Sequence, residues 1–460
     1  MGAFWLTAGF FTFVFLFGGG SRADILSLVF VRPLAAIALV LGAVRLSSQD
    51  LYRWRWLLGI LAAAALLAIV QIIPLPPGLW HALPGHGIIA DIDAAGGLEG
   101  IWRPISLSPT DTLNALFALF VPAAFLVLLV KVDPARLDRM IVLALALGLL
   151  SALVGVAQSA GPGGGPLYFY RITNPEFAVG LFSNRNHQAV VLACLYPMLA
   201  IVASRSNAKP GSVKPRLAMT VLVGIALVPL ILITGSRLGV GLAILGILSA
   251  PWVYRKPAIS PSIRRESRTR NYAPVLIGAA ALAAVAMTAV LANISVFSRF
   301  AGGHDVASDL RFRIWLPIMR MTWNYFPFGA GLGSFDYAYR IGEPDALLIP
   351  QYINHAHNDY LEVALTGGLP GVLIVLAAAI ALATRLIVVM RSRRDQVAPV
   401  ARAGAVVVVL IAVASLFDYP LRTPSIACIF ILATVCLLQE RTSDRSGPEF
   451  PTFPRKKNAL

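Results

Sequence analysis

The chain has 460 residues, of which 58% are hydrophobic and 13% charged, and its mean hydropathy is +0.76. Soluble globular proteins have roughly 45–50% apolar and about 25% charged residues, so this composition excludes a soluble body and predicts an integral membrane protein. The net charge of +16 could suggest a nucleic-acid partner. We expect none, because the basic segments lack the interleaved aromatic residues of a stacking platform.

Twelve apolar stretches are each long enough to cross a membrane as a helix, which takes roughly 17–25 residues. They cover residues 4–20, 25–44, 56–73, 112–130, 140–157, 187–203, 217–234, 238–254, 274–292, 368–390, 399–417 and 422–438. The first lacks the basic flank and cleavage site of a secretory signal, so we interpret it as a retained helix. We therefore expect an all-α integral membrane protein with about twelve transmembrane helices.

Three parts follow along the chain. Residues 1–160 hold the first five apolar stretches, and residues 161–440 hold the other seven together with a large loop at 293–367. Residues 441–460 contain Pro and basic residues and predict a disordered cytoplasmic tail.

The distribution of Lys and Arg predicts the orientation, because basic loops stay in the cytoplasm. With the N-terminus inside, most Lys and Arg and every Lys fall in cytoplasmic loops or the tail, and both termini are cytoplasmic. Three long segments then lie outside, at 74–111, 158–186 and 293–367. The last is far longer than a connection requires, which is typical of a functional loop. Within it, the apolar spacing of residues 309–325 predicts an amphipathic helix.

Polar side chains are concentrated just before the tenth apolar stretch. Residues 354–362 include His355, His357 and Asn358 together with two carboxylates. Histidine can take a proton from a hydroxyl near neutral pH, so we predict a general base here. Two alternatives are a helix cap at Asn358 or Asp359 and a metal held by both histidines. Their i, i+2 spacing does not suit one helix face and no Cys joins them, so we expect no metal.

A second polar run precedes the sixth apolar stretch. It consists of Asn184, Arg185, Asn186 and His187. This run predicts the polar rim of a cavity, and the alternative is an ordinary cap on the membrane helix.

Three arginines on the predicted outer face suit a phosphate site. Arg237 ends the short connection that begins at Thr234, and Arg311 and Arg313 open the predicted amphipathic helix. The guanidinium group presents a planar fork of donors to phosphate oxygens and stays charged in a partly dry pocket. The alternative for any one of them is contact with lipid head groups.

These motifs together resemble the O-antigen ligase family, whose relatives include O-antigen polymerases and protein O-oligosaccharyltransferases. The matching stretches are Gly180–Gln188, Thr234–Arg237, Arg311 with Trp315, and residues 327–335, 357–361 and 367–371. Each motif is weak alone, but their order, their spacing and their common placement on the outer face make the set specific. The resemblance extends over about residues 170–420.

The resemblance implies a C-type glycosyltransferase-like fold with short helices in the large periplasmic loop, located in a bacterial inner membrane. It also implies glycan transfer from an undecaprenyl-pyrophosphate carrier to a hydroxyl of lipid A-core or another glycan, among membrane lipids, without metal or cofactor. His357 would be the base, and Arg237 and Arg311 would hold the pyrophosphate. The additional His355 leaves open which histidine acts.

The same resemblance assigns the remaining polar residues to the substrate pocket. These are Asn184, Arg185, Asn186, His187, Arg313, His355 and Asn358. Polymerisation of a polysaccharide or transfer to a protein remains open, because the acceptor is not encoded in these motifs. A transporter is a further alternative, but it would need charged residues near mid-membrane. The apolar stretches are almost free of charge at their centres, with Arg32 as the main exception.

Overall fold

The computed structural model describes residues 2–205, 212–257, 306–350, 353–393 and 396–439 and the single positions 278 and 287, with side chains from residue 311 onward in the third range. Over these ranges the chain is helical, apart from turns and one isolated bridge between Leu75 and Arg103. Nearly all of the predicted ninth apolar stretch, 274–292, and the predicted tail, 441–460, lie outside the described residues.

Each of the other predicted stretches overlaps an apolar helix. These helices are α1 (Gly2–Phe17), α2 (Leu28–Ala43), α3 (Ser48–Ile72), α6 (Pro109–Ala118), α7 (Phe120–Leu129), α8 (Leu137–Ala160), α9 (Arg185–Ser204), α10 (Val213–Leu232), α11 (Arg237–Val253), α16 (Asp359–Arg391), α17 (Pro399–Ala414) and α18 (Pro424–Leu437). In the described ranges, six helical segments are long and apolar enough to cross a membrane, and five apolar helices are shorter. The expected all-α membrane protein is therefore confirmed, while the number of twelve spans stays a prediction.

Helix α9 is the centre of the bundle. Almost every residue of α9 is buried, and α8, α10, α11 and α17 pack around it. Glycines allow α11 to approach closely, because a Cβ at Gly239 would lie 2.3 Å from the Cβ of Ala189 and one at Gly246 would lie 2.9 Å from the Ala193 carbonyl oxygen. Small residues serve the same purpose between helices in membranes generally.

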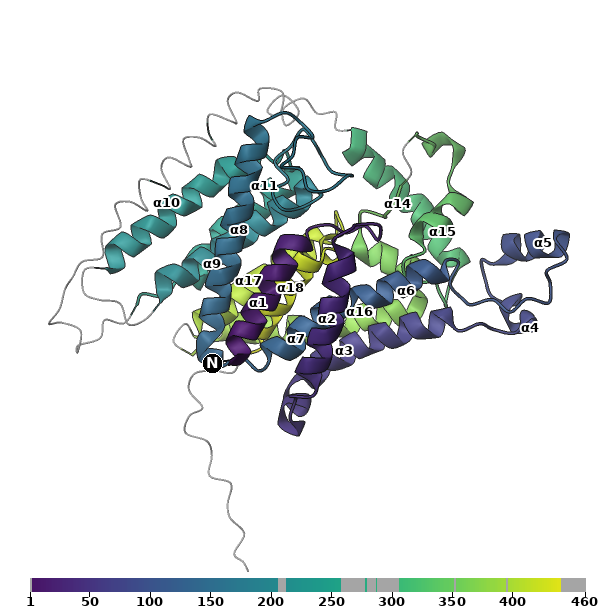
Figure 1. Ribbon diagram of the computed structural model, residues 1–460, viewed down its shortest axis with the longest axis horizontal. Helices are drawn as coiled ribbons and strands as arrows, with labels where there is room; N and C mark the ends of the chain where they lie inside the picture. Colours follow the sequence, from purple (N-terminus) through teal and green to yellow (C-terminus); the bar gives the residue numbers. More distant parts are fainter. Residues whose placement is uncertain are drawn as a thin grey trace, which may run out of the picture.

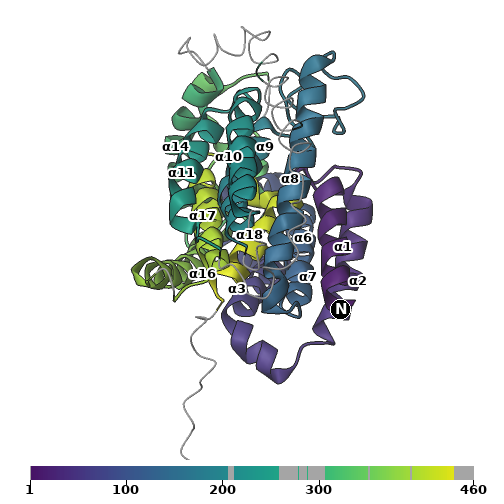
Figure 2. The same cartoon turned by 90° about the vertical axis from the view of Figure 1, so that its left-hand side faces the viewer.

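The N-terminal helices form one edge of the bundle. Figure 2 shows α1 and α2 side by side, with α6 and α7 next to them, and α7 packs against both α1 and α2. Helix α3 packs against α6 and α16. The apolar part of α16 is mostly exposed, which is typical of a helix that faces lipid.

Short helices lie in two of the segments predicted to be outside. They are α4 (Pro77–Trp80), α5 (Gly87–Ala95), α14 (Val306–Asn324) and α15 (Phe335–Gly342). Figure 1 shows α14 and α15 on one side of the bundle, with α4 and α5 beyond them at the right. The predicted amphipathic helix is thus present as α14, but its apolar residues do not form one face. Ile314 and Ile318 are buried, whereas Trp323 is 74% exposed.

One glycine bends the start of α16 and lets the chain cross it. Gly368 has a φ of +59°, and a Cβ there would meet the Pro327 carbonyl oxygen at 2.2 Å. Gln71 of α3 contacts both α16 and the segment 327–332 that crosses it. Its Nε2 donates to the carbonyl oxygens of Phe328 (3.2 Å), in this segment, and Thr366 (3.0 Å), in α16. Its Oε1 accepts from the Leu332 amide at 2.9 Å. The glycine-rich stretch at 329–333 is therefore tied to the membrane helices.

Candidate active site

Four chain segments meet at one end of the bundle and carry a cluster of polar side chains. They are the starts of α9, α11 and α16 and the connection between α17 and α18, which contains the 3-10 helix η4 (Pro420–Arg422). The side chains of the cluster are Asn186, His187, Ser236, His355, His357, Asp359, Glu362, Asp418, Tyr419 and Arg422. A polar cluster inside so apolar a chain is costly to bury, so its placement favours a functional role.

Asp418 is the fully buried centre of this cluster. Its Oδ2 accepts a 2.6 Å hydrogen bond from Nδ2 of Asn186, and its Oδ1 lies 3.4 Å from Nδ1 of His357. Ser236, the cap of α11, donates from Oγ to Oδ1 of Asn186 at 2.8 Å. One carboxylate therefore links α9, α11 and the segment before α16.

The carboxyl group of Asp418 stays ionised. Burial by itself would raise its pKa, but the contact with His357 and the charges of His187 and Arg311 outweigh that effect and hold the pKa below its ordinary value. The buried carboxylate faces Nδ1 of His357 at a distance longer than an ordinary hydrogen bond and leaves Nε2 on the opposite edge of the ring. The side chain of His357 is 23% exposed, so a substrate hydroxyl can reach it.

The backbone of His357 is strained. Its φ is +48°. Residues other than glycine rarely adopt a positive φ, and this conformation costs about 1–3 kcal/mol. The neighbouring residues hold this conformation. The Ala356 amide donates to Oε2 of Glu362 (2.9 Å), the Ala356 carbonyl oxygen accepts from Nε1 of Trp315 (3.2 Å), and Oδ1 of Asn358 caps α16 by accepting from the Leu361 amide (3.0 Å).

His355 belongs to a neighbouring ionic network. Its Nδ1 lies 3.0 Å from Oε1 of Glu362, which also accepts from Nη2 of Arg422 at 3.0 Å. Nε of Arg422 contacts Oδ1 of Asp359 at 3.2 Å. Burial lowers the pKa of His355 in spite of the Glu362 carboxylate, so this imidazole is neutral near pH 7. Burial would lower the pKa of Arg422, but Glu362 and Asp359 raise it.

Three imidazoles surround the ring of Tyr419. The ring centroids of His355, His357 and His187 lie 4.3, 5.1 and 5.4 Å from it. His187 is fully buried, and its Nδ1 is 2.9 Å from Oγ1 of Thr423. Burial raises the pKa of Tyr419 well above its ordinary value, so the phenol remains protonated. The side chains of His355 and His357 are both partly exposed, 16% and 23%, and each faces a carboxylate, so His357 differs from His355 by its greater exposure.

The predicted arginines differ in their relation to this cluster. Nη1 of Arg311 donates to the Phe417 carbonyl oxygen at 3.4 Å, and its charge contributes to the low pKa of Asp418. Arg237 is exposed and follows Ser236 directly. Arg313 is exposed on α14. The guanidinium of Arg185 lies over the ring of Phe177, 4.1 Å from its centroid.

Two predicted pocket residues are helix caps. Asn184 caps α9 by accepting from the Asn186 amide at 2.8 Å, and Asn358 caps α16. The cap alternative therefore holds for both polar runs. It does not account for Asn186, His187, His355 and His357, which the structure brings together around Tyr419 and Asp418.

Sequence reasoning missed the connection between the last two apolar helices. Asp418, Tyr419 and Arg422 lie within a few residues of one another there, between two long apolar stretches. The short connection Thr234–Arg237 holds a polar side chain at the membrane boundary, and the same argument applies to these residues. Their partners could not be predicted, because His357 and Asn186 are far away in sequence.

The residues present favour proton transfer. In the described part of the chain, no three His, Cys, Asp or Glu side chains are placed to hold a metal ion. Nδ1 of His355 and Nδ1 of His357 each face a different carboxylate, those of Glu362 and Asp418. A histidine held in this way suits a general base.

Comparison with known protein families finds a match for this chain. The O-antigen ligase family model matches residues 222–376. These residues form a region that is similar to the O-antigen ligase family. The resemblance predicted from the motifs is thereby confirmed, and it indicates a membrane enzyme of a glycosyltransferase-like kind. No curated protein matches the chain.

The O-antigen ligase region includes only part of the cluster. Of the cluster, Ser236, His355, His357, Asp359 and Glu362 lie within it, whereas Asn186, His187, Asp418, Tyr419 and Arg422 lie outside. Arg237 and Arg311, near the cluster, also lie within the matched residues. The structure joins these two groups, since His357 contacts Asp418 and Ser236 contacts Asn186.

Proposed function

We propose that this chain transfers a glycan from an undecaprenyl-pyrophosphate carrier to an acceptor hydroxyl of lipid A-core, on the periplasmic face of a bacterial inner membrane. The O-antigen ligase match supports the reaction class. One geometric observation carries the site: an accessible His357 held against the buried, ionised Asp418 with the charge of Arg311 nearby. The chain would have both termini in the cytoplasm, as its basic residues predict.

The proposed reaction is a single displacement. The acceptor hydroxyl gives its proton to Nε2 of His357 while its oxygen attacks the anomeric carbon. The bond from that carbon to the pyrophosphate oxygen breaks on the opposite side, so the configuration inverts and the pyrophosphate leaves with the electron pair. Asp418 stabilises the imidazolium that forms, as the carboxylate of a catalytic triad does. A positioned base contributes about 10²–10⁴-fold.

Arginines would stabilise the leaving group. Arg311 and Arg237 hold the pyrophosphate in this proposal, and Arg313 extends the same charged surface. Fixed positive groups aimed at developing charge are effective in a partly dry site. Asn186 and His187 position the loop that carries Asp418. The ionic network of His355, Glu362 and Arg422 supports the strained backbone of His357.

Reconstitution tests the proposal. The full chain in proteoliposomes is supplied with an undecaprenyl-pyrophosphate-linked glycan and lipid A-core, and the product is measured by mass spectrometry. We expect transfer by the native chain and by His81→Gln, because His81 is an exposed histidine outside the cluster. His357→Gln should lose about 10²–10⁴-fold in rate. Full activity of His357→Gln would reject the assignment of the base.

Other acceptors decide between the related functions. Glycan lengthening on the carrier would identify a polymerase, and transfer to a protein hydroxyl would identify a protein O-oligosaccharyltransferase. If no acceptor is modified while labelled solute accumulates in vesicles without donor, the transferase proposal is wrong and the protein is a transporter.

A further inference from the structure

A second polar site lies at the other end of the central helix. It is a cavity of about 550 Å³ lined by Asp138, Arg139, Arg205 and Arg216 together with apolar and small residues. This volume is within the range of small-molecule pockets, about 300–1,000 Å³. The proposed reaction uses none of these residues.

The pocket is separated from the active site by the length of a membrane. Helix α9 begins at the active site with Asn186 and His187 and ends at the pocket with Ser204. Its 20 residues at about 1.5 Å each give roughly 30 Å, which equals the thickness of a bilayer core. Helices α8 and α10 begin beside the pocket. The pocket therefore lies at the level of lipid head groups on the opposite face.

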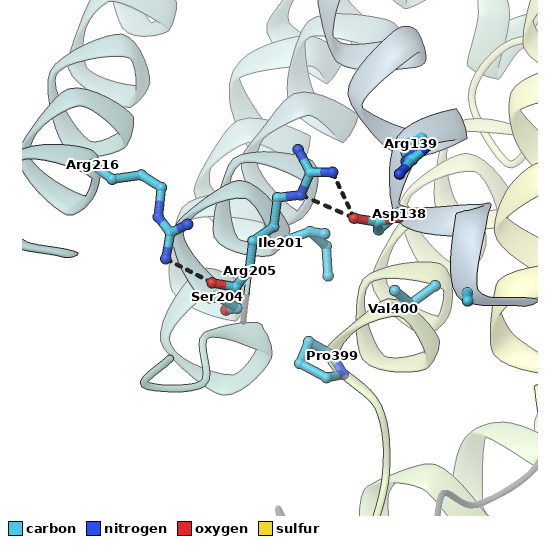
Figure 3. Close-up of a pocket in the computed structure, with 9 residues that line it drawn as sticks. Asp138, Arg139, Ile201, Ser204, Arg205, Arg216, Pro399 and Val400 are labelled. Atoms are coloured by element: carbon cyan, nitrogen blue, oxygen red, sulfur yellow. Dashed lines mark hydrogen bonds and ion pairs between the residues drawn. The ribbon is translucent and has the colours of Figure 1, made fainter. Parts of the chain in front are cut away.

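Positive charge dominates the lining. Figure 3 shows Arg216 approaching from one side, Asp138 and Arg139 from the other, and Arg205 between them. Asp138 is the acid of the lining, and its Oδ2 accepts from Nε and Nη2 of Arg205 at 2.9 and 2.8 Å. Nη2 of Arg216 donates to the Arg205 carbonyl oxygen at 2.7 Å. The lining thus holds three guanidinium groups and one carboxylate, and that carboxylate is paired with Arg205.

We propose that this pocket binds a phosphate group. Two of its arginines are already oriented by their contacts with Asp138 and with the backbone, which lowers the entropy lost when an anion binds. Arginine forks match phosphate oxygens in geometry and charge. The source is either the head group of an anionic lipid or a soluble phosphate, and basic pockets between membrane helices suit the former.

Calorimetric titration of the full chain in an uncharged detergent tests this. The probes are a short-chain phosphatidylglycerol, the diacylglycerol with the same chains, and inorganic phosphate. We expect phosphatidylglycerol to bind and diacylglycerol not to bind. Arg139→Gln and Arg216→Gln should each raise the dissociation constant about fivefold. Arg136→Gln is the matched control, because Arg136 lies at the same end of α8 but does not line the pocket.

The outcomes separate the two sources. Binding of phosphatidylglycerol but not of inorganic phosphate supports a lipid site. If inorganic phosphate also binds and Arg139→Gln weakens its binding as much as that of phosphatidylglycerol, a soluble ligand is supported. Equal binding of phosphatidylglycerol and diacylglycerol, or unchanged binding in Arg139→Gln, overturns the proposal. Arg139 is exposed on the first turn of α8, so its substitution tests the pocket even if Arg216→Gln fails to fold.

Discussion

Asp418 shows how one side chain determines the chemistry available to its neighbours. It is fully buried, yet three groups keep it ionised, and its position against Nδ1 orients the base proposed at His357. The contact at 3.4 Å is longer than an ordinary hydrogen bond. Such contacts often shorten once substrate is bound.

Asp418→Asn is expected to remove the acid–base function while keeping the shape of the site. The new amide would present its oxygen to Nδ2 of Asn186 and its NH₂ group to Nδ1 of His357, which favours the wrong tautomer of the imidazole. We expect the rate of glycan transfer to fall by at least about 10²-fold, measured in the proteoliposome assay. Asp336→Asn, on α15, is the control and should retain activity. Equal activity of the two variants would argue against the pair.

His355 gives the site a dependence of stability on pH. Its pKa is lowered by burial, so between that value and about 6.5 the unfolded chain binds a proton that the folded chain does not. Stability therefore rises with pH in this range and decreases as pH falls from 7 to 5. His355→Gln should make the change in melting temperature over this range smaller, as followed by thermal unfolding in detergent. The control His81→Gln should keep the slope of the native chain, and an unchanged slope in His355→Gln would contradict the interpretation.

At the scale of the element, the bend in the first part of α16 depends on the backbone conformation of one residue, Gly368. Two adjacent glycines there have different requirements. Gly368 has a positive φ and no room for a Cβ, whereas a Cβ at Gly367 would lie 3.5 Å from Cδ2 of Leu332, an ordinary contact. The bend lets the segment 327–332 cross the helix close to the residues that carry His357.

The pair Gly368→Ala and Gly367→Ala tests this bend. We expect Gly368→Ala to lower the free energy of unfolding by about 1–3 kcal/mol or more and to reduce transfer activity. Gly367→Ala should be neutral or slightly stabilising, since alanine is favoured over glycine in helices. Thermal unfolding of both variants gives the comparison. Similar melting temperatures for the two would show that the bend is not required.

At the scale of the whole molecule, Gln71 joins the outer segment to the membrane helices. It is buried, and its amide makes three hydrogen bonds to the backbone of Phe328, Leu332 and Thr366. Without it, the segment that crosses α16 would lose its hydrogen bonds from Phe328 and Leu332 to α3. The outer segment that precedes His357 would then be less firmly held.

Gln71→Met should remove the side-chain partner of the Phe328 carbonyl oxygen and of the Leu332 amide, while the Thr366 carbonyl oxygen still accepts from the Gly331 amide. We expect a loss of about 1–3 kcal/mol in stability and faster hydrogen exchange at the Leu332 amide, measured by mass spectrometry of peptides from this region. Gln49→Met is the matched control, because Gln49 is exposed at the other end of α3. Equal exchange in both variants would mean that other contacts hold the segment 327–332 in place.

The sequence by itself determined the membrane helices, because a run of apolar residues of sufficient length is a local property. It also marked His357, Asn186 and His187 as candidate site residues, since each lies in a polar run at a predicted helix start. That they share one pocket was implied only by the resemblance to the O-antigen ligase family. Helix caps were predictable for the same local reason, and both Asn184 and Asn358 are caps.

Only the tertiary structure decided which polar groups are partners. Asp418 contacts Asn186 and His357, which are separated from it by about 230 and about 60 residues, and no local pattern encodes such a pairing. The faces of α14 were decided in the same way: Ile314 and Trp323 both belong to the apolar spacing of the predicted helix, but packing buries one and exposes the other. The length of an apolar stretch can be read directly from the sequence. The burial and ionisation of a side chain depend instead on the groups that the fold places beside it.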